Sequence, residues 1–131
     1  MIRVVLVDDE RLALERLKRV LLRLEGIEVI GAFTSSRQAI GHIFDLRPDV
    51  AFLDIEMPGL NGLEAAEEIR AVDENIDVVF VTGFDRYAVN EVEPYAVDCL
   101  LKPVSEEMLQ KTVRHIIARR GAAVEREESG E

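Results

Sequence analysis

Four short apolar runs of this 131-residue chain each lead into a side chain that can bind a cation or a phosphate. The side chains are carboxylates, one hydroxyl and one ammonium. The carboxyl ends of parallel strands meet at one edge of an open sheet, and ligands bind there. The pattern therefore predicts a carboxylate nucleophile beside a divalent metal. The runs and the residues after them are Ile2–Val7 with Asp8 and Asp9, Val50–Leu53 with Asp54, Val78–Val81 with Thr82, and Val97–Leu101 with Lys102.

Three acids gathered at one place repel one another. Two carboxylates about 4 Å apart repel by about 4 kcal/mol at an effective dielectric constant of about 20. Asp8, Asp9 and Asp54 must therefore take up a proton, spread apart or bind a cation. Ligands that are all oxygen favour Mg²⁺, or Mn²⁺ in its place. An ionised carboxylate beside such a metal can attack phosphorus, and Lys102 and Thr82 can then bind phosphoryl oxygens.

Each of these residues also has a plain structural alternative. Asp8 or Asp9 alone could cap the helix that follows. Thr82 alone could be an ordinary strand residue. Lys102-Pro103 alone could be an ordinary loop, and a Lys–Pro junction also allows a cis peptide. The order of all these residues at successive strand ends favours the metal and phosphate site over the separate alternatives.

The elements that must carry these residues follow from the hydrophobic pattern. Continuous β-branched runs predict strands covered on both faces, and apolar residues three or four positions apart predict helices. The predicted strands are Ile2–Val7, Glu28–Phe33, Val50–Leu53, Asp77–Val81 and Val97–Leu101. The predicted helices are Glu10–Leu24, Ser36–Leu46, Gly62–Val72, Asp85–Glu91 and Ser105–Arg120, the last with Ser105 as its N-cap.

Five strand–helix repeats predict an α/β fold with a doubly wound parallel sheet and right-handed crossovers. Residues 1–120 form one domain by this pattern. From Gly121 onward the periodicity ends and glutamate is frequent. Residues 121–131 are therefore expected to be a flexible acidic tail, or a linker to a further domain that is absent from this chain.

Composition narrows the classes of protein to consider. A hydrophobic content of 48% fits one globular core, and a net charge of −10 argues against direct binding of nucleic acid or an anionic membrane. Cys99 is the only cysteine, which excludes an internal disulfide and favours a reducing compartment. The N-terminus lacks a signal-peptide pattern, and no apolar run approaches the roughly 20 residues of a membrane span. We expect a cytoplasmic protein.

Together, the motifs at the strand ends identify a family. Over about residues 1–120 the chain resembles the receiver domain of bacterial two-component response regulators. The resemblance implies a flavodoxin-like fold of five βα repeats with the strand order 2-1-3-4-5. The residues that carry it are Val7-Asp8-Asp9-Glu10, the run from Phe52 to Gly62, Val81-Thr82-Gly83 and Leu100-Leu101-Lys102-Pro103.

The resemblance also implies a mechanism. Asp54 would accept a phosphoryl group from a sensor histidine kinase in a Mg²⁺-dependent reaction, and the domain would then change conformation to control an output such as transcription. It would act as a switch domain and not as a conventional turnover enzyme, and phosphorylation would promote a homodimer. The other implied roles are Asp9 as a direct metal ligand beside Asp8, Asp54 and the Glu56 backbone carbonyl as further ligands, and Thr82 and Lys102 as contacts of the phosphoryl group.

Two segments, Phe80–Ala88 and Ala96–Val104, are similar to receivers that precede LytTR-type DNA-binding modules. One position departs from the family pattern, because the family usually has Tyr or Phe three residues before the site lysine and this chain has Cys99. A thiol cannot fill a pocket the size of an aromatic ring, so the usual coupling of threonine to that ring is in doubt. Cys99 is either a small buried apolar residue or a redox switch, which would require exposure and a lowered pKa.

Other classes share part of this pattern. A haloacid-dehalogenase-like phosphatase also has a strand-end aspartate followed two residues later by an acid, as Asp54 and Glu56 are, but its second acid is normally Asp and its chain is longer. A receiver that acts only as a protein-binding module would lack Asp54 or Lys102, and both are present. A flavodoxin-like electron carrier needs hydroxyls and amides in its first loop, where this chain has acids that would repel phosphate.

Overall fold

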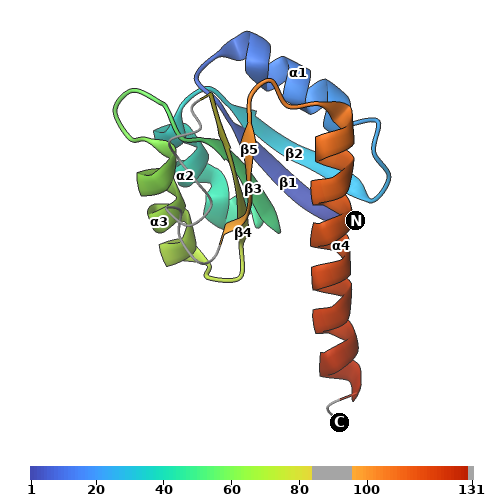
Figure 1. Ribbon diagram of the computed structural model, residues 1–131. Helices are drawn as coiled ribbons and strands as arrows, with labels where there is room; N and C mark the ends of the chain where they lie inside the picture. Colours follow the sequence, from blue (N-terminus) through green and yellow to red (C-terminus); the bar gives the residue numbers. More distant parts are fainter. Residues whose placement is uncertain (84–95, 130–131) are drawn as a thin grey trace.

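The computed structural model describes residues 1–83 and 96–129, with side chains for residues 1–83 and 96–121. Five parallel strands form one sheet in the order β2-β1-β3-β4-β5 (Figure 1). The predicted α/β fold and strand order are confirmed, and the helix predicted at Asp85–Glu91 lies outside the described residues. The strands are β1 (Ile2–Val7), β2 (Ile27–Phe33), β3 (Val50–Asp54), β4 (Asp77–Thr82) and β5 (Ala96–Leu101). The described helices are α1 (Arg11–Leu21), α2 (Ser36–Leu46), α3 (Gly62–Val72) and α4 (Glu106–Ser129).

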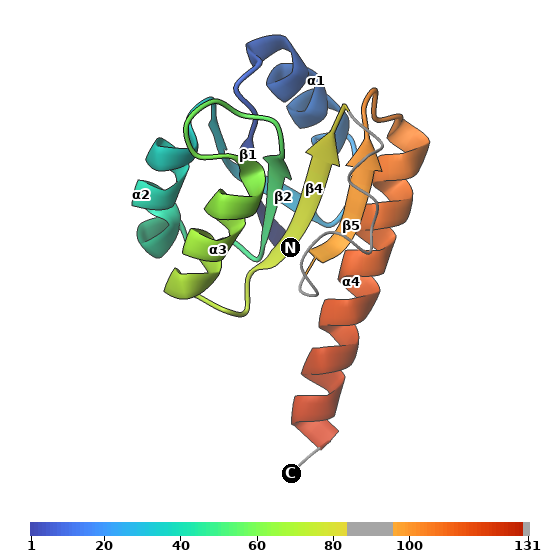
Figure 2. The ribbon, with the colours of Figure 1, turned by 60° about the vertical axis from the view of Figure 1, so that its left-hand side comes forward.

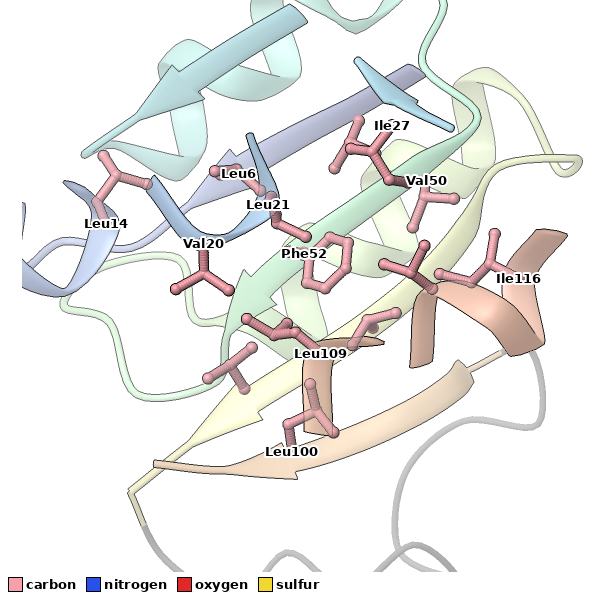
Figure 3. Packing of buried hydrophobic residues seen from close by; sticks show 14 residues of the cluster. Leu6, Leu14, Val20, Leu21, Ile27, Val50, Phe52, Leu100, Leu109 and Ile116 are labelled. Atoms are coloured by element: carbon pink, nitrogen blue, oxygen red, sulfur yellow. The ribbon is translucent and has the colours of Figure 1, made fainter. Parts of the chain in front are cut away.

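The sheet lies between two helical layers, with α1 and α4 on one face and α2 and α3 on the other (Figures 1 and 2). Alternate residues of each central strand point to opposite faces, so two separate apolar clusters form. Phe52 belongs to the cluster under α1 and α4, where Figure 3 shows it amid Leu21 and Leu109. Phe80 belongs to the cluster under α2 and α3. Burial on both faces explains why β3 and β4 read as continuous apolar runs.

Side-chain caps fix the starts of the helices α3 and α4. Asn61 Oδ1 accepts a hydrogen bond from Glu64 N at 2.9 Å, and Glu64 Oε1 accepts one from Asn61 N at 3.1 Å, which is a complete capping box for α3. Ser105 Oγ accepts a hydrogen bond from Met108 N at 3.1 Å, which confirms Ser105 as the cap of α4. The observed bounds of α2 and α3 equal the predicted ones.

Helix ends were harder to predict than helix starts. Helix α1 ends at Leu21 and not at Leu24, because the chain tightens there into bonds such as Leu24 N to Leu21 O at 3.0 Å. Helix α4 continues past Arg120 to Ser129, so the predicted end at Arg120 is wrong. Alanine, glutamate and arginine favour helix, and extension of a formed helix requires no new nucleus. Although α4 is long, no helix of the described residues combines the length and apolarity that a membrane span requires.

The connection from β3 to α3 folds back tightly on the strand end. Gly62 N donates to the Ile55 carbonyl at 3.0 Å. A Cβ atom on Gly62 would lie 2.8 Å from the Cα atom of Ile55, and closer still to the carbonyl oxygen of Asp54. Only glycine allows this approach, so Gly62 helps to fix the backbone of Asp54.

We expect the substitution Gly62→Ala to lower the free energy of unfolding by about 1–3 kcal/mol, because the added methyl group must push the backbone of Ile55 away. Urea denaturation followed by circular dichroism measures the change. Gly41→Ala is the matched control, since Gly41 lies on the exposed side of α2 with no atom near its Cβ position. The control should raise the stability by roughly 0.5–1 kcal/mol. Equal effects of the two substitutions would show that the close approach is unimportant.

Candidate functional site

The three predicted carboxylates meet at the carboxyl edge of the sheet. Asp8 and Asp9 follow β1, and Asp54 ends β3, the strand beside β1. One carboxylate oxygen of each residue lies within 4.8 Å of those of the other two. Asp8 and Asp54 are each only 4% exposed, whereas Asp9 is exposed. Two of the acids are therefore fixed inside the protein, and the third faces solvent.

Backbone hydrogen bonds orient the two buried acids. Glu10 N donates to Asp8 Oδ1 at 2.9 Å, and Glu56 N donates to Asp54 Oδ1 at 3.1 Å. The capping alternative for Asp8 or Asp9 is not observed, because the N-cap residue of α1 is Glu10. In both buried acids the oxygen Oδ1 is held by a backbone amide, which leaves Oδ2 for another partner.

Lys102 is that partner. Its Nζ atom lies 2.8 Å from Asp8 Oδ2 and 3.2 Å from Asp54 Oδ2. Burial lowers the pKa of Lys102, but the hydrogen bond to Asp8 and the charges of Asp8 and Asp54 outweigh burial, so the pKa is raised above its ordinary value. The lysine side chain therefore stays charged. Separately, the peptide bond from Lys102 to Pro103 is cis.

Thr82 ends β4 at the same edge and is buried. Its carbonyl accepts a hydrogen bond from Lys102 N at 2.7 Å. On the other side of β4, Val81 is paired with Asp54 in the sheet. Thr82 thus lies between the strands that carry the nucleophile candidate and the lysine, and all five predicted side chains are gathered at one edge.

The pKa of the Asp54 carboxyl is raised to about 6. Burial is the main cause and the charge of Asp8 is the second, while Lys102 acts in the opposite direction. Asp8, Asp9 and Asp54 offer only oxygen atoms and carry excess negative charge. These features fit a hard divalent cation such as Mg²⁺ or Mn²⁺, which these three residues would hold.

The two histidines and the cysteine of the chain lie away from this edge. His42 stacks on Phe33 with 5.5 Å between ring centroids, and His115 is exposed on α4. Cys99 is partly buried beside the cluster under α2 and α3. Burial and the charge of Asp98 raise the pKa of its thiol. This direction contradicts the redox interpretation of Cys99 and favours the apolar one.

One feature beside the site has no signal in the sequence. A cavity of about 260 Å³ borders Lys102 and Asp8. Its walls come from α1 and from the start of α4 and the connection before it, including Leu17, Pro103 and Val104. The cavity depends on the spacing of two helices that are far apart in the chain, and a local pattern cannot encode that spacing.

Comparisons with known proteins show which family the chain is similar to. The family model described as the response regulator receiver domain matches residues 4–114. The chain is 43% identical over 116 residues to the transcriptional regulatory protein BtsR of Salmonella typhi, which covers 88% of the chain and 48% of the relative. It is 37% identical over 114 residues to the sensory transduction protein LytT of Bacillus cereus, which covers 87% of the chain and 46% of the relative. The chain thus spans about half the length of the curated relatives it matches.

A solved structure has the same fold. The signal receiver domain of a modulated diguanylate cyclase from Desulfovibrio desulfuricans G20 superposes with a TM-score of 0.79 at 31% identity. The match covers 92% of this chain and 97% of that structure. The likeness to LytT supports the predicted similarity to receivers that precede LytTR-type modules.

The raised pKa of Asp54 predicts a pH-dependent stability of the metal-free protein. The folded state binds this proton more tightly than the unfolded state, whose pKa is near 3.8. The stabilisation by the proton is complete below about pH 4 and is lost as the pH rises through about 6. Asp54→Asn cannot ionise, so we expect it to be more stable than the parent protein at pH 8 by on the order of 1–3 kcal/mol, with a smaller difference at pH 4.

Urea denaturation in EDTA at several pH values measures this difference. Glu68→Gln is the control, because it removes an exposed acid on α3 and should leave the pH profile of the parent protein unchanged. A lower stability of Asp54→Asn at pH 8 would contradict the electrostatic account of the site.

Proposed function

This chain belongs to the response regulator receiver domain family, and on that premise we propose that Asp54 accepts a phosphoryl group and thereby switches the domain between two conformations. The observation that supports this proposal most directly is the convergence of three carboxylates with Lys102 at the carboxyl edge of the sheet. The phosphoryl donor is a phosphohistidine of a sensor kinase, or a small acyl phosphate in its place.

Asp54 is the nucleophile in this proposal. With a pKa of about 6, its carboxylate is mostly ionised at neutral pH. One carboxylate oxygen attacks phosphorus as the bond from phosphorus to the donor atom breaks, and the donor leaves with the bonding electron pair. When bound, Mg²⁺ would neutralise charge on the phosphoryl oxygens. Asp8, Asp9, Asp54 and the backbone carbonyl of Glu56 are the residues that would hold the metal.

Lys102 and Thr82 contact the phosphoryl group in the product. Lys102 already faces Asp54 at 3.2 Å, so an oxygen of an attached phosphoryl group would come within its reach. Thr82 offers a hydroxyl from the next strand. A covalent group shifts a conformational equilibrium only if it interacts differently with the two states, and these two side chains supply that difference. The expected reporting surface comprises β5, α4 and the segment before β5, which lies outside the described residues.

The partners follow from the family and from the charge of the chain. We propose a sensor histidine kinase as the phosphodonor and a homodimer that forms on phosphorylation. The relatives named as transcriptional regulators support an output in transcription. This output would belong to the part of the protein beyond the half of the relatives' length that this chain spans. A net charge of −10 supports the proposal that this domain itself contacts neither nucleic acid nor membrane, and a cytoplasmic location agrees with these roles.

We expect the chain to gain the mass of one phosphoryl group when it is incubated with acetyl phosphate and Mg²⁺. Asp54 is then ionised, and Mg²⁺ neutralises charge on the phosphoryl oxygens of the donor. Intact-protein mass spectrometry measures the gain. Asp54→Asn and the parent protein in EDTA should gain nothing, and Asp45→Asn, an exposed acid of α2, should react like the parent protein. Modification of Asp54→Asn would refute the assignment. Continuous release of phosphate without a modified protein would instead indicate the phosphatase alternative.

Lys102 should also determine how the rate of Asp54 phosphorylation depends on pH. The charge of Lys102 lowers the pKa of Asp54, so Lys102→Gln should raise that pKa further above 6. Less carboxylate is then ionised at pH 7, and we expect a several-fold slower modification there that recovers as the pH is raised towards 9. The rate measured by mass at a series of pH values tests this, with Lys111→Gln as control. A loss that is the same at every pH would mean that Lys102 acts only on the phosphoryl group.

A further inference from the structure

The last helix is anchored at the end of the sheet opposite to the candidate site. Arg120 Nη2 donates hydrogen bonds to the carbonyl oxygens of Asp49, at 2.5 Å, and Asn75, at 2.8 Å. Its Nη1 lies 3.4 Å from Asp49 Oδ1, and its Nε makes an ion-pair contact of 3.3 Å with Asp77 Oδ2. Arg119 adds a second contact of 3.3 Å to Asp77 Oδ1. We call these five residues the Arg120 clamp.

The clamp joins two strands that also reach the site. Asp49 directly precedes β3 and Asp77 opens β4, and Asp77 N donates to the Asp49 carbonyl at 2.9 Å. At their other ends the same two strands carry Asp54 and Thr82. Arg120 therefore holds α4 to the starts of the two strands whose ends form the candidate site.

Asp77 is the buried member of the clamp, and the side chains of Arg120, Asp49 and Arg119 are partly or largely exposed. Asp77 is only 6% exposed, and a buried carboxylate without a partner would destabilise the fold. The planar guanidinium of arginine can meet several acceptors in fixed directions at once, which an ammonium cannot. The side chain of Arg120 is itself 26% exposed, in contrast to the exposed Arg114 earlier in α4.

Other contacts fix α4 along its length up to Arg120. Leu109, Val113 and Ile116 are buried against the sheet. Between them Thr112 Oγ1 donates to Asp98 Oδ2 of β5 at 2.8 Å. Among the described side chains of α4, Arg119 and Arg120 make the last contacts with the sheet that the structure shows, and the C-terminal part of the helix projects away from the domain (Figures 1 and 2). The clamp thus stands at the place where the helix departs.

We propose that the Arg120 clamp sets the direction in which α4 leaves the domain, so that residues 121–129 form a rigid arm in a fixed orientation to β3 and β4. Without the clamp, Ile116 would be the last buried contact that holds α4 to the sheet, and the helix beyond Ile116 would change direction. The inference concerns the chain without phosphate and does not depend on the proposed phosphoryl transfer. It would make residues 121–129 of the expected acidic tail or linker a rigid extension of α4.

Two measurements on the full 131-residue chain test the arm. Hydrogen exchange by mass spectrometry reports local opening, and Arg120→Gln should accelerate exchange in the segment 113–121 by about tenfold while β1 is unchanged. Double electron–electron resonance reports orientation, with spin labels at Gln38→Cys on α2 and Ala123→Cys on the arm in a Cys99→Ser chain. The distance distribution should be narrow with the clamp intact and broader in Arg120→Gln.

Three further variants sharpen the test. Arg114→Gln removes an exposed cation from the same helix and should leave both measurements unchanged. Arg120→Lys keeps the charge but loses the planar geometry, so it should resemble Arg120→Gln. Asp49→Asn removes one contact of the clamp and should produce a smaller effect in the same segment, which also covers the case that Arg120→Gln does not fold. Equal distributions with and without Arg120, or faster exchange throughout the sheet, would overturn the proposal.

Discussion

The contact of one partly buried ammonium with two buried carboxylates is the constraint on which the site depends. Asp8 follows β1 and Asp54 ends the neighbouring β3, and adjacent strands are only about 4.8 Å apart, so the fold brings their charges together. Lys102 offsets part of this repulsion, but the burial of Asp54 and the charge of Asp8 still raise the pKa of Asp54. The acids keep their places because backbone amides hold one oxygen of each and because apolar cores cover both faces of their strands.

Most of the fold was predictable from the sequence because its signals are local. The continuous run Val50–Leu53 is typical of a strand covered on two sides, and the bounds of α2 and α3 were set by the residues at their ends. The site was predictable for a related reason, since parallel strands bring the residues after each run to one edge. The end of α1 was not, because the tightening after Leu21 is a small difference between competing backbone hydrogen bonds.

Features that depend on distant parts of the chain escaped prediction. Asp49 and Asp77 stand at strand starts, and no local pattern connects them to Arg120, some seventy residues after Asp49. Likewise the sequence left two interpretations of Cys99, and the choice required its burial and the neighbouring charge of Asp98. The place of the usual aromatic ring is therefore taken by a small side chain packed against the cluster under α2 and α3.

The carboxylates and the lysine of the site are attached to strands that differ in their number of neighbouring strands. Asp8 and Asp9 follow β1 and Asp54 ends β3, and each of these strands has a neighbour on either side. Lys102 follows β5, one of the two edge strands, whose residues are mostly only partly buried. An interior strand cannot shift without disturbing two ladders of hydrogen bonds, but an edge strand disturbs one. The carboxylates are thus held firmly in place, whereas Lys102 follows a strand that can shift more easily. Any rearrangement around a bound anion should therefore begin at β5 and spread from there.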